Sequence, residues 1–210
     1  GNGDDMVDTG YAEDFIEGGA GSDMLSGGDS DDVMYGDVLY GINNALDSDQ
    51  APGTWSLGTV DGWFNTGSGG VIERWGPGFG GTNTLDGSGF IELDANTGGG
   101  VDHLQTNLEL ETGVEYVITI DHAARPGGGV NDDFEVTLKG VVVATVSPTS
   151  IGSFETFTMT ITGAAGTDVI GFREIASQSN SLGILLDNFT ISLSDAGVAA
   201  SPSTFDDIID

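Results

Sequence analysis

The chain of 210 residues carries 34 acidic side chains and only four basic ones, which gives a net charge of −30. This balance excludes nucleic acid as a partner, because phosphate binding needs Lys and Arg, and it disfavours anionic membrane surfaces. An apolar content of 38% is sufficient for the core of one or two domains. No apolar run approaches the roughly 20 residues of a transmembrane helix, so direct membrane insertion is not expected.

The first 37 residues repeat with a period of nine, in the consecutive units GNGDDMVDT, GYAEDFIEG, GAGSDMLSG and GDSDDVMYG. An aspartate recurs in the middle of each unit, and an apolar residue follows two positions later. The aspartates are Asp5, Asp14, Asp23 and Asp32, and the apolar residues are Val7, Ile16, Leu25 and Met34. The turn half of the units contains Gly1, Gly3, Gly10, Gly19, Gly21 and Gly28.

Each unit is expected to form a glycine turn followed by a short strand. Glycine reaches positive φ without steric cost, which allows a tight turn with exposed carbonyl groups. One inward apolar residue per unit is too little core for independent stability, so neighbouring units must stack. Stacking brings carboxylates and carbonyl oxygens together, and such a site favours calcium, which takes roughly 6–8 oxygen ligands. Residues 1–37 contain no His or Cys, which argues against zinc or copper.

This pattern, GGxGxDxUx, resembles the calcium-binding nonapeptide of the RTX family of secreted proteins. Residues 1–36 carry the resemblance, although Ala12 and Ser30 replace the second turn glycine. The resemblance implies a parallel β-roll in which two units form one coil and calcium bridges turns on the same side. Asp5 and Asp23 would then serve one side of the roll, and Asp14 and Asp32 the other. The alternative is an acidic, glycine-rich disordered linker, which the common phase of the apolar residues disfavours.

The nonapeptide pattern stops after Gly36 and returns at the end of the chain. Aligning residues 205–210 with residues 12–17 puts Asp207 at the calcium position and Ile209 at the inward apolar position. The sequence therefore predicts a domain inserted into a repeat array, and a chain that is part of a longer protein. The predicted parts are 1–37 (β-roll repeats), 38–200 (inserted β-sandwich) and 201–210 (resumed repeat).

The inserted region has the composition and alternation of an all-β domain. Strands are predicted at 70–75, 90–93, 114–120, 134–138, 141–146, 157–161, 169–172 and 184–193. Lys139-Gly140 is the predicted turn of a hairpin, and the best place for a short helix is Asn43–Asp47. Many short strands with glycine-rich turns indicate an antiparallel sandwich, or jelly roll, of about 160 residues.

Several motifs of this region resemble, in order, the galactose-binding-like jelly rolls of secreted bacterial proteins and large RTX adhesins. They are Val60-Asp-Gly-Trp63, the segment 86–94, the segment 116–127 and Gly183-Ile-Leu-Leu-Asp-Asn-Phe189. Members of that family bind glycans or peptides, and some RTX adhesins carry a peptide-binding domain split out of their repeats. The resemblance also implies a structural calcium ion at Asp187-Asn188. The alternative is that these two residues are polar groups on a solvent face.

The best candidate for a ligand site is the segment 121–133, which is predicted to be a loop. It combines the guanidinium fork of Arg125 with glycines and with the side chains of Asp121, Asn131, Asp132 and Asp133. The alternative is a hairpin loop in which Arg125 pairs with a nearby aspartate.

Aromatic residues could stack on a sugar ring or clamp a peptide. Trp75, which precedes Gly-Pro-Gly, is expected to be exposed and to join the ligand site, whereas Trp63 is expected in the core. Trp55, Phe64 and Phe79 are further candidates.

No catalytic residue is predicted. Asp102-His103 and Asp121-His122 lack an accompanying nucleophile motif, and a histidine in a core or on a surface is commoner than a catalytic one. We therefore expect a secreted or surface adhesion module that binds several calcium ions and a peptide or glycan on a host or neighbouring cell. The alternatives are a carbohydrate-binding or catalytic part of a polysaccharide-active enzyme, and a structural spacer without a ligand.

Overall fold

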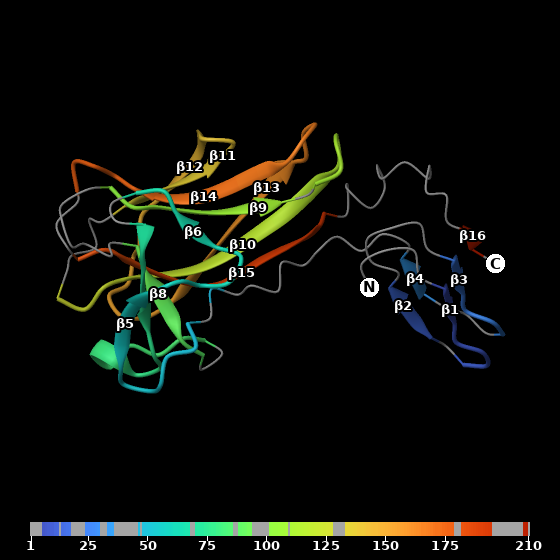
Figure 1. Ribbon diagram of the computed structural model, residues 1–210, viewed down its shortest axis with the longest axis horizontal. Helices are drawn as coiled ribbons and strands as arrows, with labels where there is room; N and C mark the ends of the chain where they lie inside the picture. Colours follow the sequence, from blue (N-terminus) through green and yellow to red (C-terminus); the bar gives the residue numbers. More distant parts are fainter. Residues whose placement is uncertain are drawn as a thin grey trace.

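The computed structural model shows an all-β chain whose main body is an antiparallel sandwich, which confirms the predicted all-β class and sandwich, while the β-roll stays a prediction (Figure 1). The structure describes residues 6–12, 14–17, 24–29, 33–35, 46, 48–67, 70–85, 88–93, 101–108, 110–127, 133–178, 182–194 and 208–209. Within that part of the chain, no helix is long and apolar enough to cross a membrane.

One layer of the sandwich is a six-stranded sheet with the order β13-β10-β15-β8-β7-β5. Its strands are β5 (Trp55–Gly58), β7 (Ile72–Trp75), β8 (Phe90–Glu92), β10 (Glu115–Ala124), β13 (Glu155–Thr162) and β15 (Ile184–Leu193). On β13 the predicted alternation is observed, because Phe157, Met159 and Ile161 pack on the core between exposed threonines.

The other layer is a five-stranded sheet with the order β12-β11-β14-β9-β6. Its strands are β6 (Phe64–Asn65), β9 (His103–Leu108), β11 (Phe134–Leu138), β12 (Val141–Val146) and β14 (Asp168–Glu174). The predicted hairpin of β11 and β12 is confirmed. Its turn places Lys139 at φ 50° and Gly140 at φ 77°, a conformation that glycine adopts readily.

The main core lies between the two sheets and is built around aromatic rings. Trp63 stacks on Phe172 at 5.8 Å between ring centroids and meets Phe189 edge-on at 5.2 Å. The prediction that Trp63 belongs to the core is therefore confirmed. Tyr116 and Phe134 are also fully buried in this cluster. Burying such rings supplies a large part of the hydrophobic stabilisation.

A second, smaller apolar cluster lies on the opposite face of the six-stranded sheet. It contains Trp75, Phe90, Ala123 and Leu185, with Phe79 and Phe154 packed against it. Strand alternation explains the division, because Ile91 points into the main core and its neighbour Phe90 points to the other face. Phe79 belongs to the short 3₁₀ helix η2 (Phe79–Gly81) and lies over the ring of Trp75.

The repeat region forms parallel strand pairs. β1 (Met6–Asp8) pairs with β3 (Met24–Ser26), and β2 (Phe15–Glu17) pairs with β4 (Val33–Tyr35). In both pairs each residue lies opposite the residue two nonapeptides further along the chain. Ile16 and Leu25, two of the predicted inward residues, are buried.

The end of the chain joins the same sheet. β16 (Ile208–Ile209) pairs in parallel with β3, on the side opposite β1, and Ile209 lies opposite Leu25. The predicted domain boundaries themselves stay predictions.

Several predicted residues lie outside the described part of the chain. They are Gly1, Gly3, Asp5, Gly19, Gly21, Asp23, Asp32, Asn131, Asp132 and Asp207. Of the predicted short helix, only Leu46 is described.

Candidate ligand-binding site

The predicted ligand loop begins later than expected. Residues 121–124 continue strand β10, where they pair with β13 and β15. Asp121 is buried and accepts hydrogen bonds from Thr156 Oγ1 at 2.5 Å and Asn188 Nδ2 at 3.1 Å. The prediction of a loop at Asp121 is therefore wrong, because β13 supplies ladder partners up to His122 and β15 up to Ala124. Asp121 ties strands together inside the sheet.

Asp187 and Asn188 lie inside β15 and not after it. Asp187 is the cross-strand partner of Asp121 and is equally buried, while Asn188 adopts φ 51° where the register shifts. This is a β-bulge, and asparagine tolerates its left-handed conformation. Among the described residues no group of three or more His, Asp or Glu side chains converges to hold a metal ion. A calcium ion at Asp187-Asn188 stays a prediction.

The expected exposure of Trp75 is wrong, because only 2% of the residue is accessible. Its ring packs edge-on against Phe79 at 4.6 Å and tilted against Phe90 at 5.6 Å. Its indole N–H donates to Glu73 Oε1 at 2.9 Å. The 3₁₀ turn that follows Gly-Pro-Gly folds back over the ring and covers it.

Arg125 lies above Trp75, with the guanidinium carbon 5.0 Å from the ring centroid. Its Nη1 donates to Glu92 Oε1 at 2.7 Å, and the backbone N–H of Gly183 donates to the same oxygen at 2.8 Å. Arg125 is thus paired, as the alternative interpretation held, but with Glu92 on β8 and not with an aspartate. Arg125 and Trp75, both predicted for the ligand site, contact each other in a mostly buried cluster, and their role in binding stays a prediction.

Glu92 has an unusual environment for a carboxyl group. Its side chain is fully buried, and Oε2 has no hydrogen-bond partner. Burial and the charge of Glu73 raise the pKa of Glu92 to about 8, although Arg125 opposes the shift. Asp133, at the far end of the predicted loop, instead exchanges hydrogen bonds with Gln178 at 2.6 and 3.0 Å.

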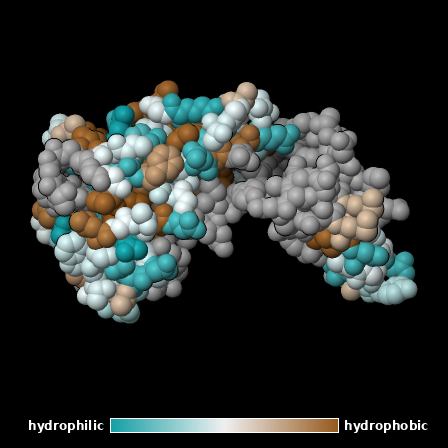
Figure 2. All heavy atoms as spheres, in the orientation of Figure 1, coloured by the Kyte–Doolittle hydropathy of each residue, from teal (hydrophilic) through white to brown (hydrophobic). Residues whose placement is uncertain are grey.

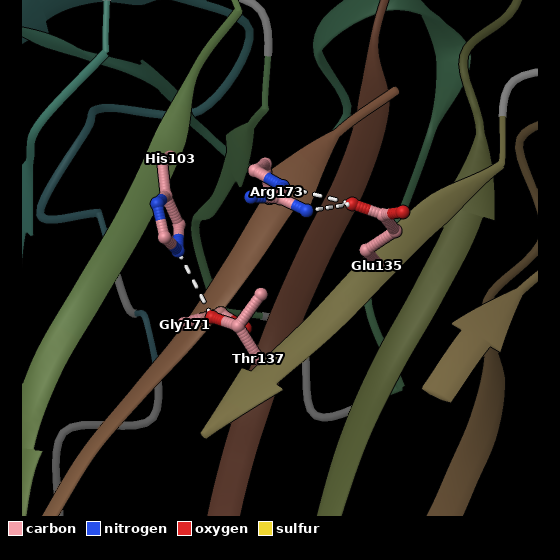
Figure 3. Close-up of polar contacts among 5 residues, drawn as sticks. All are labelled: His103, Glu135, Thr137, Gly171 and Arg173. Atoms are coloured by element: carbon pink, nitrogen blue, oxygen red, sulfur yellow. Dashed lines mark hydrogen bonds and ion pairs between the residues drawn. The ribbon is translucent and has the colours of Figure 1, made fainter. Parts of the chain in front are cut away.

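A second group of polar side chains lies on the outer surface of the five-stranded sheet. It comprises His103, Gln105, Glu135, Thr137 and Arg173, together with Gly171, and is here called the polar face. Figure 3 shows five of its members on three neighbouring strands, β9, β14 and β11. The residues beside them in sequence, Leu104, Val136 and Phe172, belong to the main core, so alternation turns the polar residues outward.

An ion pair crosses two strands of the polar face. Arg173 donates from Nε and Nη2 to Glu135 Oε2, at 2.8 and 2.5 Å (Figure 3). About a third of the Arg173 side chain and a fifth of the Glu135 side chain remain accessible. The pair leaves Arg173 Nη1 as a donor and Glu135 Oε1 as an acceptor for a bound molecule.

His103 is held beside this ion pair by a contact that only glycine permits. Its Nε2 lies 2.9 Å from Thr137 Oγ1, directly above Gly171 (Figure 3). A Cβ atom at Gly171 would lie 2.5 Å from His103 Nε2 and 2.8 Å from Thr137 Oγ1, which is too close for either. Burial and the charge of Arg173 lower the pKa of His103, although Glu135 opposes the shift. His103 is therefore neutral at neutral pH.

An aromatic ring stands at the rim of the polar face. Phe64 on β6 is the cross-strand partner of Gln105 and is 39% accessible. Gln105 is oriented by Thr66, whose hydroxyl donates to Gln105 Oε1 at 2.9 Å. The polar face thus combines hydrogen-bond donors, acceptors, a balanced ion pair and an accessible ring.

The remaining candidates are less suitable for binding. A surface hollow of about 420 Å³ is lined by Leu110, Glu111, Gly166 and Thr167, with one charged side chain and no aromatic ring. His122 is buried against Phe134, 5.5 Å between ring centroids, and burial lowers its pKa. The visible side of the sandwich mixes hydrophobic and hydrophilic residues throughout (Figure 2).

Sequence reasoning considered His103 only as a catalytic residue and did not single out Glu135, Thr137, Gly171 or Arg173. A signal was nevertheless present, because Arg173 is one of four basic residues and lies next to a predicted strand. The polar residues 135 and 137 also alternate with apolar ones. What the sequence lacked was the strand order that brings them together.

No protein-family model matches the sequence, and no curated protein matches it. Solved structures with a similar fold include a family 35 carbohydrate-binding module from Clostridium thermocellum, at 13% identity and a TM-score of 0.46. This similarity covers 67% of the present chain and 99% of that one. A CBM35 from Paenibacillus barcinonensis is 18% identical, with a TM-score of 0.43 over 68% of this chain and 100% of the other.

A third similar structure is the C-terminal CBM6 of the laminarinase LamC from Zobellia galactanivorans. It is 16% identical with a TM-score of 0.42, over 58% of this chain and 87% of the module. At these values the similarity is too remote to assign a family or a ligand to the chain.

Proposed function

We propose that the chain is a non-catalytic, carbohydrate-binding module of a secreted or surface protein of the RTX type, with calcium bound in its nonapeptide repeats. The observation that carries the binding function is the polar face, where the accessible ring of Phe64 lies opposite Gln105 on the same sheet surface as His103, Arg173 and Glu135. Sugar rings offer apolar C–H surfaces and hydroxyl groups that both donate and accept. Such a ligand matches a ring next to mixed donors and acceptors.

The charge of the polar face favours a neutral ligand. Arg173 and Glu135 neutralise each other, so neither sign of charge dominates the face. The whole chain has a net charge of −30, which repels anionic ligands at longer range. A neutral glycan meets neither obstacle, and hydrogen bonds to the charged pair are stronger than those to neutral groups.

The environments of two acidic residues, Glu92 and Glu135, support a non-catalytic role. Glycoside hydrolysis needs two carboxyl groups that reach the substrate, one of them with a raised pKa. Glu92 has the raised pKa, but its fully buried side chain cannot touch a substrate. Glu135 is accessible, but it is engaged by two nitrogen atoms of Arg173.

The repeat strands support the proposed calcium array. A Cβ atom at Gly28 would overlap the carbonyl oxygen of Gly10, and the N–H of Asp29 donates to that same oxygen at 2.8 Å. Turns two units apart therefore stack closely, at glycines with φ of 98° and 85°. Stacked turns rich in aspartate and carbonyl oxygen suit calcium, and the ion would stabilise the array by removing carboxylate repulsion. Of the four predicted repeat aspartates, only Asp14 lies among the described residues.

The pairing of β16 with β3 supports the proposal that the sandwich interrupts the repeats. Ile209 lies opposite Leu25, the register that the sequence alignment requires. A calcium-dependent array fits a location outside the cell, where calcium is abundant. The calcium-bound repeats would then form a rigid support that presents the sandwich to its ligand.

The proposal is tested by glycan binding in millimolar calcium. An immobilised glycan array followed by calorimetry should identify at least one carbohydrate ligand. Phe64→Ala and Arg173→Gln should each weaken binding about tenfold, because each removes one contact on the polar face. Trp55→Ala is a matched control, since Trp55 is 51% exposed on β5 of the other sheet. Absence of any glycan ligand for the folded protein would refute the proposed carbohydrate binding. Loss of binding only with Trp55→Ala would refute the proposed location of the site on the polar face.

A further inference from the structure

We infer that His103 determines the specificity of the polar face by accepting a hydrogen bond at Nδ1 from a hydroxyl group of a neutral glycan. This inference rests on the carbohydrate-binding function proposed above. It assigns a single tautomer to His103, a chemical class to the ligand and a pH range to the binding.

The hydrogen bonds of Thr137 define the tautomer. The side chain is fully buried, and its hydroxyl hydrogen has two possible acceptors, the carbonyl oxygen of Gly171 at 3.3 Å and Nε2 of His103 at 2.9 Å. Both contacts are used only if Thr137 donates to Gly171 and His103 donates to Thr137. A carbonyl oxygen can only accept, whereas a ring nitrogen can donate.

The neutral ring then has its one hydrogen on Nε2, so Nδ1 carries a lone pair. Within the part of the chain that the structure describes, Nδ1 of His103 takes no hydrogen bond and is not buried. It therefore offers an acceptor on the outer surface of the sheet. Arg173, the neighbour of His103 on β14, keeps Nη1 as a donor beside it.

The surrounding charges keep this acceptor available at neutral pH. Arg173 from β14 and Glu135 from β11 are the charged groups that face His103, while β6 contributes the uncharged Phe64 and Asn65. Protonation of His103 would place a second cation next to Arg173. Burial of the ring is the main cause that lowers the pKa of His103 from its ordinary value; the charge of Arg173 adds to the shift and Glu135 opposes it.

The arrangement selects a class of ligand. A sugar that donates one hydroxyl to His103 Nδ1 would present its other hydroxyls to Arg173, the cross-strand neighbour of His103, so a ligand with several hydroxyls is favoured. A carboxylate placed at Nδ1 has no hydrogen to donate, and the negative charge of Glu135 on the same face disfavours a charged sugar further. Protonated His103 has no acceptor left, so acid should abolish this contact.

The test combines binding with a direct measurement of the tautomer. Calorimetry uses gluco-, manno-, galacto- and xylo-oligosaccharides as neutral probes, and oligouronates from alginate and polygalacturonate as charged ones. Wild-type protein should bind a neutral probe at pH 7.5 and lose affinity as the pH falls through the pKa of His103, which the NMR titration below measures in the same protein. Titration of the side-chain nitrogens by NMR should show Nδ1 unprotonated at pH 7.5. The chain has only two histidines, so a His122→Gln variant assigns the signals.

Two substitutions separate recognition from folding. His103→Gln keeps one donor for Thr137 and one acceptor for the ligand, so it should retain binding with a flat pH profile. His103→Ala should lose about tenfold at pH 7.5 while melting remains cooperative.

If the affinity for a neutral probe changes neither with pH nor in His103→Ala, the inference is overturned and the proposed function stands. An Nδ1–H tautomer, or preference for the oligouronates, would also overturn the inference alone. Failure of the folded protein to bind any probe would overturn both.

Discussion

At the residue scale, the two carboxyl groups of Glu73 and Glu92 show how burial changes the chemistry of a side chain. They are cross-strand partners in β7 and β8, yet one hydrogen-bonds an indole N–H while the other is fully buried. Burial without a partner for Oε2 disfavours the charged form of Glu92. The pair therefore supplies a pH-dependent term in the stability of the sandwich.

Glu92→Gln should make stability less dependent on pH. The pKa of Glu92 is about 8 in the folded state and 4.5 as the ordinary value, so the folded state binds more protons between these limits. Protonated Glu92 therefore contributes its whole share to the free energy of unfolding below pH 4.5, and this contribution is lost as the pH rises towards 8. Denaturant unfolding should show Glu92→Gln close to wild type at pH 4.5 and more stable by about 1–4 kcal/mol at pH 8.

Subtracting the free energy of unfolding of wild type from that of Glu92→Gln at each pH removes the contribution of the titrating groups that both proteins share. Glu73→Gln is a useful control, because removing the neighbouring charge should lower the pKa of Glu92 and reduce the pH dependence in part. Parallel stability curves for wild type and Glu92→Gln would contradict the prediction.

Gly171 has no side chain, and this leaves the space in which His103 and Thr137 meet on the polar face. Gly171→Ala would push a methyl group into His103 Nε2 and Thr137 Oγ1, and Thr137 is fully buried and cannot move freely. We expect a loss of about 1–3 kcal/mol in the free energy of unfolding, together with weaker glycan binding. Thermal melting and calorimetry measure the two effects. Unchanged binding in Gly171→Ala would show that the ligand does not use His103.

Among the secondary-structure elements, strands with alternating apolar and polar residues could be predicted from the sequence, but the bulge that interrupts β15 could not. The strands 134–138, 141–146 and 184–193 were predicted with the observed bounds, because each has a run of β-forming residues between clear turn signals. Strand β9 was missed, since its inward positions are Leu104, Thr106 and Leu108 and its outward positions are all polar. The bulge at Asn188 was also missed, because a bulge depends on the register of the neighbouring strand.

The bulge leads to a prediction about Asn188. Its φ of 51° suits asparagine or glycine but strains a β-branched side chain, and its Nδ2 donates to buried Asp121. Asn188→Val should therefore lower the free energy of unfolding by about 2 kcal/mol more than Asn188→Gly does. Denaturant unfolding of the two variants, which both lack the Asp121 hydrogen bond, isolates the backbone effect. Equal losses would show that the bulge is unstrained.

At the scale of the whole molecule, the two kinds of β structure have different sources of stability. The sandwich has a large aromatic core, whereas the repeats bury single residues such as Ile16 and Leu25 among many acidic ones. We therefore expect the stability of the repeats to depend on a bound cation more strongly than that of the sandwich does.

Removal of calcium should unfold the repeats and spare the sandwich core. All three tryptophans lie between residues 55 and 75, so tryptophan fluorescence reports the sandwich alone. A chelator should reduce the β signal in circular dichroism, while the fluorescence melting curve retains one cooperative transition. Calcium, but not magnesium, should restore the lost signal. A circular dichroism spectrum and a melting temperature that do not change when the chelator is added would contradict the proposed calcium array.

The nine-residue period, the all-β class and the hairpin of β11 and β12 could be predicted from the sequence. These features arise from residues close in the chain, where glycine conformations and apolar alternation act locally. The three-dimensional fold was needed to show that Trp75 is buried, that Arg125 pairs with Glu92, and that His103, Glu135 and Gly171 meet. The strand order β11-β14-β9 joins segments that are distant in sequence. That order depends on how the two sheets share one core, and no local pattern encodes it.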